Sequence, residues 1–482
     1  MTTNDTGTMD MQGSSAAEES AVGPRSGLII GMLVVAAFVM ILNETIVSVA
    51  LPDLAKILDV SATTVQWLAS GFLLTMAVVI PTTGFLLERF SPRAIFLTAM
   101  SLFSVGTLVC AASPNFEVLL AGRVVQAGGT AVMIPLLMTT VMRLVPEDKR
   151  GATMGTMAIV IGFAPALGPT VGGAILSGMG WRWMFWLVLI LAAAMFAVGA
   201  TRMHVPGETR KVPLDVASVI MSGLAFAGIV YGFSLIGRSG DTLMPAWAPI
   251  VAGLVVLGGF VWRQMVLQRE DRPLLSLLPL GYRQFTVSVI VGVLVFMSLL
   301  GAGAILLPMY MQNVLGESTF ITGLALLPGG LALAALSRPV GRLYDRVGAR
   351  PLLIPGAAGM TAALWLFALL GEDSSVWAVI GIDILLMVAL GVMMTPMMTE
   401  ALGVLPDSLY SHGSAILTTL QQVAGALGSA VFVSVATLGS SGPILDADGM
   451  RLAFATAGAI SIVAFVATLF LKRSAPAGGH GH

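Results

Sequence analysis

Fourteen apolar runs, each long enough to cross a lipid bilayer, fill almost the whole chain between residues 27 and 472. A helix needs about 20 apolar residues to span a hydrocarbon core that is about 30 Å thick. Continuous runs of this length indicate helices, because only helices and closed barrels satisfy their backbone groups in lipid. The sequence therefore predicts an all-α membrane protein with fourteen spans.

The composition agrees with burial in a membrane. Of the 482 residues, 57% are hydrophobic and only 10% are charged, whereas soluble proteins contain about 25% charged residues. Cys110 is the only cysteine, and the four histidines form no ligand cluster. We therefore expect no disulfide framework, no metal site, no cofactor and no enzymatic activity. We also expect no nucleic-acid partner.

Basic residues define the predicted orientation. If the N-terminus lies inside, the only basic residues in the outer loops are Lys56, Arg182, Arg238 and Arg451. An excess of lysine and arginine marks cytoplasmic loops, so we expect both termini in the cytoplasm. Arginine outnumbers lysine 20 to 4, which suggests a GC-rich bacterial genome, and we therefore expect the chain in a bacterial cytoplasmic membrane. Residues 1–26 and 473–482 are predicted to be cytoplasmic tails, the first of them disordered.

Two inner loops repeat one pattern of glycine, acid and two arginines at identical spacing. The first copy is Gly84, Glu88, Arg89 and Arg93, and the second is Gly341, Asp345, Arg346 and Arg350. Eight spans separate the copies, so both keep the same orientation. This predicts two six-helix bundles, 27–202 and 284–472, around a central site, with a two-helix insertion and its cytoplasmic linkers at 203–283.

Several motifs resemble those of a known family. The loop 84–93, the run Gly-Arg-Val-Val-Gln-Ala-Gly-Gly at 122–129 and the run Gly-Pro-Thr-Val-Gly-Gly at 168–173 resemble three motifs of the major facilitator superfamily. The segments 42–52, 181–183 and 411–422 resemble its fourteen-span drug:proton antiporters. The resemblance covers residues 27–472. It implies an antiporter that exports drugs or other amphipathic molecules in exchange for protons by alternating access. The sequence leaves the oligomeric state open, and we expect a monomer.

Glu44 is the deep carboxylate of the first span. A charge at such depth costs several kcal/mol, so it should face the bundle interior or a wet cavity. We interpret it as a proton carrier, with Ser48 one turn away on the same face. The alternative is a structural glutamate bonded to a neighbouring helix. Two positions depart from the family pattern: Asn43 stands where many relatives have aspartate, and Glu88 replaces the usual loop aspartate.

Two further polar residues lie within predicted spans. Asp383 in the twelfth span is interpreted as a proton site or a counter-charge for cationic substrates, or as a residue hydrated near the headgroups. Arg123 in the fourth span needs an acceptor, which is either Glu44 or backbone carbonyls. The resemblance associates Arg123 with proton transfer, and the alternative is a structural clamp between helices.

The fifth span combines small residues with prolines, in the order Gly162, Pro165, Gly168, Pro169, Gly172 and Gly173. Glycines four residues apart give a smooth face for close helix packing. Pro169 removes a backbone hydrogen bond and should bend the helix. The resemblance implies an exporter signature that prevents proton leak, and ordinary small-residue packing is the alternative.

The repeated loops are interpreted as a cytoplasmic latch, in which charge pairs tie neighbouring helix ends in the outward-facing state. Simple anchoring by basic residues is the alternative. Residues expected to line the substrate cavity are Asn43, Gln126, Met393, Met394, Met397 and Met398. Methionine gives flexible, polarizable walls, although a methionine stripe also suits plain helix packing. Other functions that share these features are a dedicated exporter of a single metabolite or antibiotic, and a non-transporting membrane sensor.

Overall fold

The fourteen predicted runs form fourteen helical passes in the computed structural model. The structure describes residues 24–60, 62–65, 67–203, 215–235, 245, 247–270, 273–440 and 445–471, and none of these residues forms a strand. The tail predicted at 473–482, most of the tail at 1–26 and part of the linker at 203–215 lie outside the described residues. Twelve of the described passes are long and apolar enough to cross a membrane, and α9 contains a shorter apolar stretch. The predicted fold class is confirmed.

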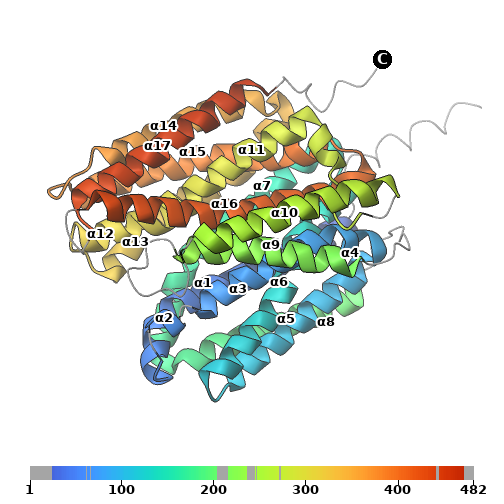
Figure 1. Ribbon diagram of the computed structural model, residues 1–482, viewed down its shortest axis with the longest axis horizontal. Helices are drawn as coiled ribbons and strands as arrows, with labels where there is room; N and C mark the ends of the chain where they lie inside the picture. Colours follow the sequence, from blue (N-terminus) through green and yellow to red (C-terminus); the bar gives the residue numbers. More distant parts are fainter. Residues whose placement is uncertain are drawn as a thin grey trace, which may run out of the picture.

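The first eight helices make six passes. Their bounds are α1 Pro24–Ile57, α2 Ala62–Val65, α3 Trp67–Val79, α4 Thr83–Arg89, α5 Pro92–Ala112, α6 Phe116–Leu144, α7 Glu147–Met179 and α8 Trp181–Arg202, with the short helix η1 Ile80–Thr82 between α3 and α4. Within this group α5 packs on α6 and α8, and α1 packs on α7. Apart from α7, which is labelled higher up among the last helices, the group occupies the lower part of Figure 1.

The last seven α-helices make six further passes. Their bounds are α11 Arg283–Met297, α12 Leu307–Asn313, α13 Thr319–Val347, α14 Arg350–Ala368, α15 Val376–Gly403, α16 Tyr410–Gly439 and α17 Ala447–Leu469. A π-helical segment, Ser298–Leu306, joins α11 to α12 within one pass. This group occupies the upper part of Figure 1 and contacts the first group chiefly through α7 with α13 and α16 with α4 and α6. The bundle boundaries at 27–202 and 284–472 remain predictions.

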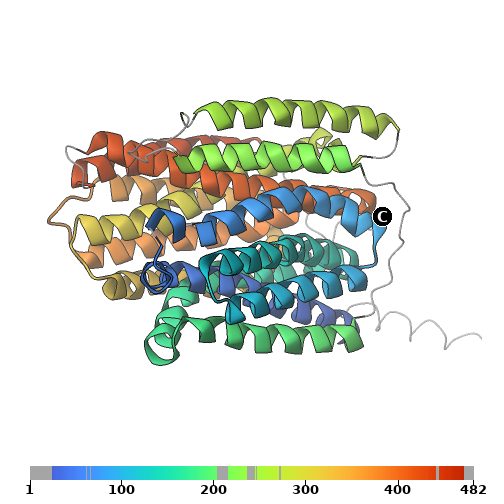
Figure 2. The same ribbon diagram turned by 60° about the horizontal axis from the view of Figure 1, so that its bottom comes forward.

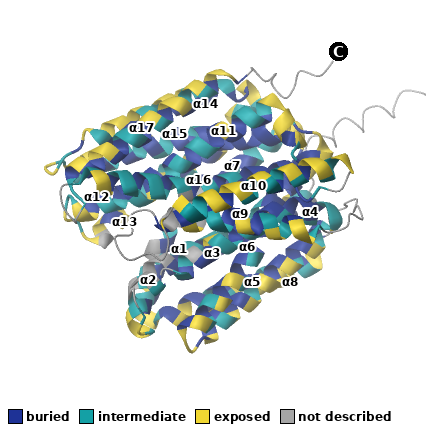
Figure 3. Cartoon of the chain, in the orientation of Figure 1, coloured by how far each residue is buried: buried dark blue, intermediate teal, exposed yellow. Residues whose placement is uncertain are grey.

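The two additional helices, α9 (Val216–Leu235) and α10 (Trp247–Arg269), pack along each other. α9 also contacts α3 and α16, so the pair covers one seam between the two groups, with α10 outermost (Figure 2). Arg263 of α10 donates two hydrogen bonds to Asp215, at 2.8 and 2.9 Å. This fork lowers the pKa of Asp215 to about 2. The exposed residues in Figure 3 are frequent on α10 and on other outward faces, as lipid contact requires.

Turn chemistry fixes several helix ends. Asn115 accepts a hydrogen bond from the N–H of Val118 at 3.0 Å and caps the start of α6. Pro92 occupies the first turn of α5, where its missing N–H has no cost. Gly348 ends α13 with φ of 78°, a left-handed conformation that glycine adopts without strain.

One end of the molecule collects many helix termini. α4, α10 and α13 end there, and α5, α7, α14 and α16 begin there, as the hydrogen bonds described below require. We call it the basic end, because it contains Arg89, Arg150, Arg269 and Arg346. It is the end that the sequence predicts to be cytoplasmic, and this orientation remains a prediction.

Candidate functional site

A buried polar cluster joins α3, α5 and α6 around Arg123, whose side chain is 1% exposed. Nε of Arg123 donates to the carbonyl oxygen of Leu68 at 3.2 Å, and Nη1 donates to Oε1 of Gln126 at 3.0 Å. Nε2 of Gln126 in turn donates to the hydroxyl of Thr107 at 2.7 Å. The guanidinium also lies 4.1 Å from the centre of the Phe72 ring. A backbone carbonyl and an amide oxygen are therefore the acceptors for this buried cation.

Glu44 is half-buried on α1 and lies within electrostatic range of Arg123, without forming an ion pair with it. Among the described residues Glu44 has no hydrogen-bond partner, so the alternative of a permanently bonded glutamate finds no support there. Asn43 is 1% exposed, and its Nδ2 also lacks a partner in the described part of the chain. The side chain of Ser48 lies outside the described residues.

Asp383 lies on α15 and is 1% exposed. Neither of its carboxylate oxygens has a hydrogen-bond partner within the described ranges. It faces Gly329 of α13, where an added Cβ would collide with Oδ2. Hydration near the headgroups is therefore wrong for this conformation, because the side chain is buried between two helices. Its roles as a proton site or counter-charge remain predictions.

The small residues of α7 bring this helix close to α1. A Cβ added at Gly168 would collide with the side chain of Thr45, the neighbour of Glu44. At Gly172 a Cβ would lie 3.2 Å from the carbonyl oxygen of Ile46. Gly173, in contrast, has open space beside it. The remaining members of the motif lie in α7 with side chains outside the described residues: Gly162, Pro165 and Pro169.

The acids of the two repeated loops contact helices of the opposite group. Oε1 of Glu88 in α4 lies 2.9 Å from Nε2 of His412 in α16. Asp345 in α13 accepts hydrogen bonds from the main-chain N–H groups of Gly151 at 2.8 Å and Ala152 at 3.0 Å, both in α7. These two acids occupy equivalent positions in the repeat. We call their contacts the basic-end latch.

The first glycine of each loop makes this close approach possible. A Cβ at Gly84 would lie 2.7 Å from Nδ1 of His412. A Cβ at Gly341 would collide with the carbonyl oxygen of Gly151. The recurrence of glycine and acid in the two loops therefore has a single physical cause. In each loop the glycine leaves room for a helix of the other group, and the acid binds that helix.

The arginines of the first loop contact a backbone carbonyl and an aromatic ring. Arg93 donates to a carbonyl oxygen at the end of α8 at 2.5 Å, and Arg89 lies over an aromatic ring at 5.8 Å. Arg346 and Arg350 make no hydrogen bond or ion pair with any described residue. Main-chain N–H groups of α7 satisfy Asp345.

The segment 274–277, which follows α10, is held by side chains at every N–H group. The N–H groups of Leu274 and Leu275 donate to Oε1 of Gln264, at 2.9 and 3.1 Å. The N–H of Ser276 donates to Nδ1 of His412 at 3.2 Å, and the N–H of Leu277 donates to Oε1 of Gln268 at 3.1 Å. Nδ1 of His412 is thus an acceptor, which leaves the N–H on Nε2 for Glu88.

Glu400 is a functional candidate that the sequence pattern does not single out. It lies near the basic end of α15, is 2% exposed, and accepts hydrogen bonds from Tyr344 Oη and Gln284 Nε2, both at 3.1 Å. Tyr344 directly precedes Asp345, so this carboxylate supports the latch. In the sequence Glu400 stands at the border of an apolar run, where a glutamate is usually hydrated. Only its position relative to the membrane surface could have indicated that it is buried.

The sequence predicts that four methionines of α15 line the substrate cavity: Met393, Met394, Met397 and Met398. All four are at most 1% exposed. Met393 and Met397 fill the space beside Gly356 of α14 and Gly292 of α11. In this conformation they pack inside the second helix group, and their role in the cavity remains a prediction, as do those of Asn43 and Gln126.

A comparison with known families agrees with the repeated loops and the helical passes. The profile of the Major Facilitator Superfamily matches residues 33–429. The chain belongs to the major facilitator superfamily. Members of this superfamily are transporters and not enzymes. This chain is therefore a transporter. No cluster of three or more potential metal ligands occurs among the residues that the structure describes.

Curated relatives of this major facilitator protein include resistance proteins. LmrB of Listeria monocytogenes, a lincomycin resistance protein, is 38% identical over 422 residues, which cover 88% of this chain and 89% of that protein. MdtD of Pectobacterium carotovorum, a putative multidrug resistance protein, is 28% identical over 82% of this chain and 84% of its own. The human organic anion transporter MFSD10 has a TM-score of 0.67 at 17% identity, covering 92% of this chain and 100% of that one, which shows the shared fold alone.

Proposed function

We propose that this chain is a proton-coupled antiporter that exports drugs or other amphipathic small molecules across a bacterial cytoplasmic membrane. Relatives named for resistance to lincomycin and to multiple drugs support the substrate class. Proton coupling rests on one observation: Glu44 is half-buried near Arg123 and has no hydrogen-bond partner among the described residues. A carboxyl group in such a place can gain and lose a proton without breaking a structural bond.

Alternating access is supported by the basic-end latch. Its two contacts join α4 to α16 and α13 to α7, at the end that we propose is cytoplasmic. The latch consists of hydrogen bonds to two carboxylates. Hydrogen bonds to charged groups contribute about 1.5–3 kcal/mol each, so a few contacts of this kind can form and break in every transport cycle. We propose that the latch is closed while the opposite end admits protons, and that its opening admits drug from the cytoplasm. Both termini then face the cytoplasm, and the chain works as a monomer.

Reconstitution in liposomes with an imposed pH gradient tests the proposal. We expect labelled lincomycin to accumulate on the acidic side, and expect an opposing drug gradient to move protons through the same protein. Protein-free liposomes are the control. Equal drug flux with and without the pH gradient would contradict coupled exchange. Transport of one compound from a broad panel would indicate a dedicated exporter, and absence of flux for the whole panel would favour a sensor.

Arg123→Lys is expected to reduce proton-driven transport to a small fraction of the wild-type rate. Lysine keeps the charge, but its single ammonium group has no planar fork to bind both the Leu68 carbonyl and Gln126. Arg143→Lys, at the exposed end of the same helix, is the matched control. Both are measured by drug efflux from cells at equal expression. Wild-type efflux by Arg123→Lys would show that the fork geometry is dispensable.

A further inference from the structure

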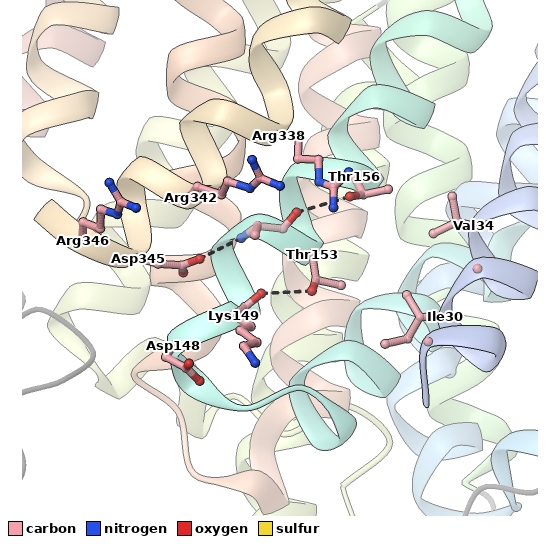
Figure 4. Close-up of a pocket in the computed structure, with 13 residues that line it drawn as sticks. Ile30, Val34, Asp148, Lys149, Thr153, Thr156, Arg338, Arg342, Asp345 and Arg346 are labelled. Carbon is pink, nitrogen blue, oxygen red and sulfur yellow. Dashed lines mark hydrogen bonds between the residues drawn. The ribbon is translucent and has the colours of Figure 1, made fainter. Parts of the chain in front are cut away.

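An open pocket lies at the basic end between α1, α7 and α13 (Figure 4). Its volume is about 880 Å³. Three arginines of α13 line one side of it: Arg338, Arg342 and Arg346. Residues four apart share a face of a helix, so the three guanidinium groups emerge along one side of the pocket.

The positive charge of these arginines is not neutralised within the described structure. All three are exposed, and none makes a hydrogen bond or ion pair with a described residue. Asp345 also lines the pocket, but both of its oxygens accept main-chain N–H groups of α7. Lys149 adds a fourth cation and Asp148 a second acid. The pocket therefore has an excess of positive charge.

The facing wall comes from α1 and has no polar side chain. It consists of Gly27, Ile30, Gly31 and Val34, whose spacing places them on one face of the helix. A Cβ added at Gly27 or Gly31 would meet no atom within 4 Å, so a furrow lies open along α1. In Figure 4, Ile30 and Val34 lie across the pocket from the arginines.

We propose that this pocket binds an anionic phospholipid, with its phosphate on the α13 arginines and an acyl chain in the α1 furrow. A guanidinium fork matches the geometry of phosphate. Basic pockets between membrane helices at the cytoplasmic side suit acidic headgroups. A soluble anion would find the same cations but would leave the apolar wall uncovered. The bound lipid bridges α1 and α7 to α13, and thus spans the same two helix groups as the latch.

Native mass spectrometry of the full chain in detergent tests this site, with added dioleoyl phosphatidylglycerol or dioleoyl phosphatidylcholine as probes. We expect the wild-type protein to retain phosphatidylglycerol preferentially. Removing two cations by Arg338→Gln and Arg342→Gln together is expected to weaken that preference by about tenfold or more. The matched control, Arg143→Gln with Arg283→Gln, removes the same charge from exposed positions at the same end and should keep the wild-type preference.

A second variant tests the furrow independently of charge. Gly31→Leu fills the open space along α1 and is expected to lower phosphatidylglycerol retention while the melting temperature stays unchanged. Inorganic phosphate at millimolar concentration is the soluble probe, and it should not displace the lipid. Equal retention of the two lipids by the wild type, an unchanged preference in the double variant, or displacement by phosphate alone would each overturn the proposal.

Discussion

A Glu44→Gln protein is expected to fold and to bind drug, yet to lose export driven by a pH gradient. Glutamine has nearly the same shape and can still form hydrogen bonds, but it cannot take up and release a proton. Because Glu44 has no hydrogen-bond partner among the described residues, its replacement breaks no structural contact there. In liposomes with an imposed pH gradient, drug flux should fall to the level of protein-free vesicles.

Two further measurements separate lost coupling from lost folding. Exchange of labelled for unlabelled drug at equal pH needs no proton, so the Glu44→Gln variant should retain it. Glu117→Gln, an exposed carboxyl group in the first turn of α6, is the matched control and should transport as the wild type does. Uphill drug transport by Glu44→Gln in response to the pH gradient would exclude Glu44 as the proton carrier.

Gly168→Ala is expected to destabilise the protein and to impair transport strongly, whereas Gly173→Ala should leave both unchanged. A methyl group at Gly168 collides with Thr45, next to Glu44, and Thr45 has main-chain atoms close behind it. Forcing extra atoms into a packed contact costs about 1–3 kcal/mol. The same group at Gly173 meets no atom within 4 Å.

The two glycines form a matched pair, since both belong to one sequence motif and one helix. Melting temperature in detergent and drug efflux at equal expression measure the two effects. Equal behaviour of the two variants would show that the close approach of α7 to α1 does not control function. A stable but inactive Gly168→Ala protein would indicate that the contact positions Glu44 more than it stabilises the fold.

The fold was predictable because lipid imposes strong rules on sequence. Apolar runs had to be helices, and the recurrence of glycine and acid at Gly84, Glu88, Gly341 and Asp345 indicated two equivalent loops. The structure shows why that recurrence carries information, since each loop contacts a helix of the opposite group. Such a pattern recurs in the sequence because the two equivalent loops have the same backbone geometry.

Partners within the site could not be predicted in the same way. The acceptor for Arg123 is the main-chain carbonyl of Leu68, and the donors to Asp345 are main-chain N–H groups. Every residue carries such groups, so residue identity does not mark them. Glu400 was missed for a related reason, because its burial depends on Tyr344 and Gln284, which are distant in the chain.

The hydrogen bonds of His412 have a mechanical consequence for the two additional helices. Nε2 of this imidazole contacts Glu88 of α4. Nδ1 accepts a hydrogen bond from the segment 274–277, which Gln264 of α10 also binds. Withdrawal of α16 from α4 must therefore either carry that tether along or detach it. The segment after α10 is thus coupled to opening of the basic end, and a substitution at Gln264 is expected to change the rate of transport.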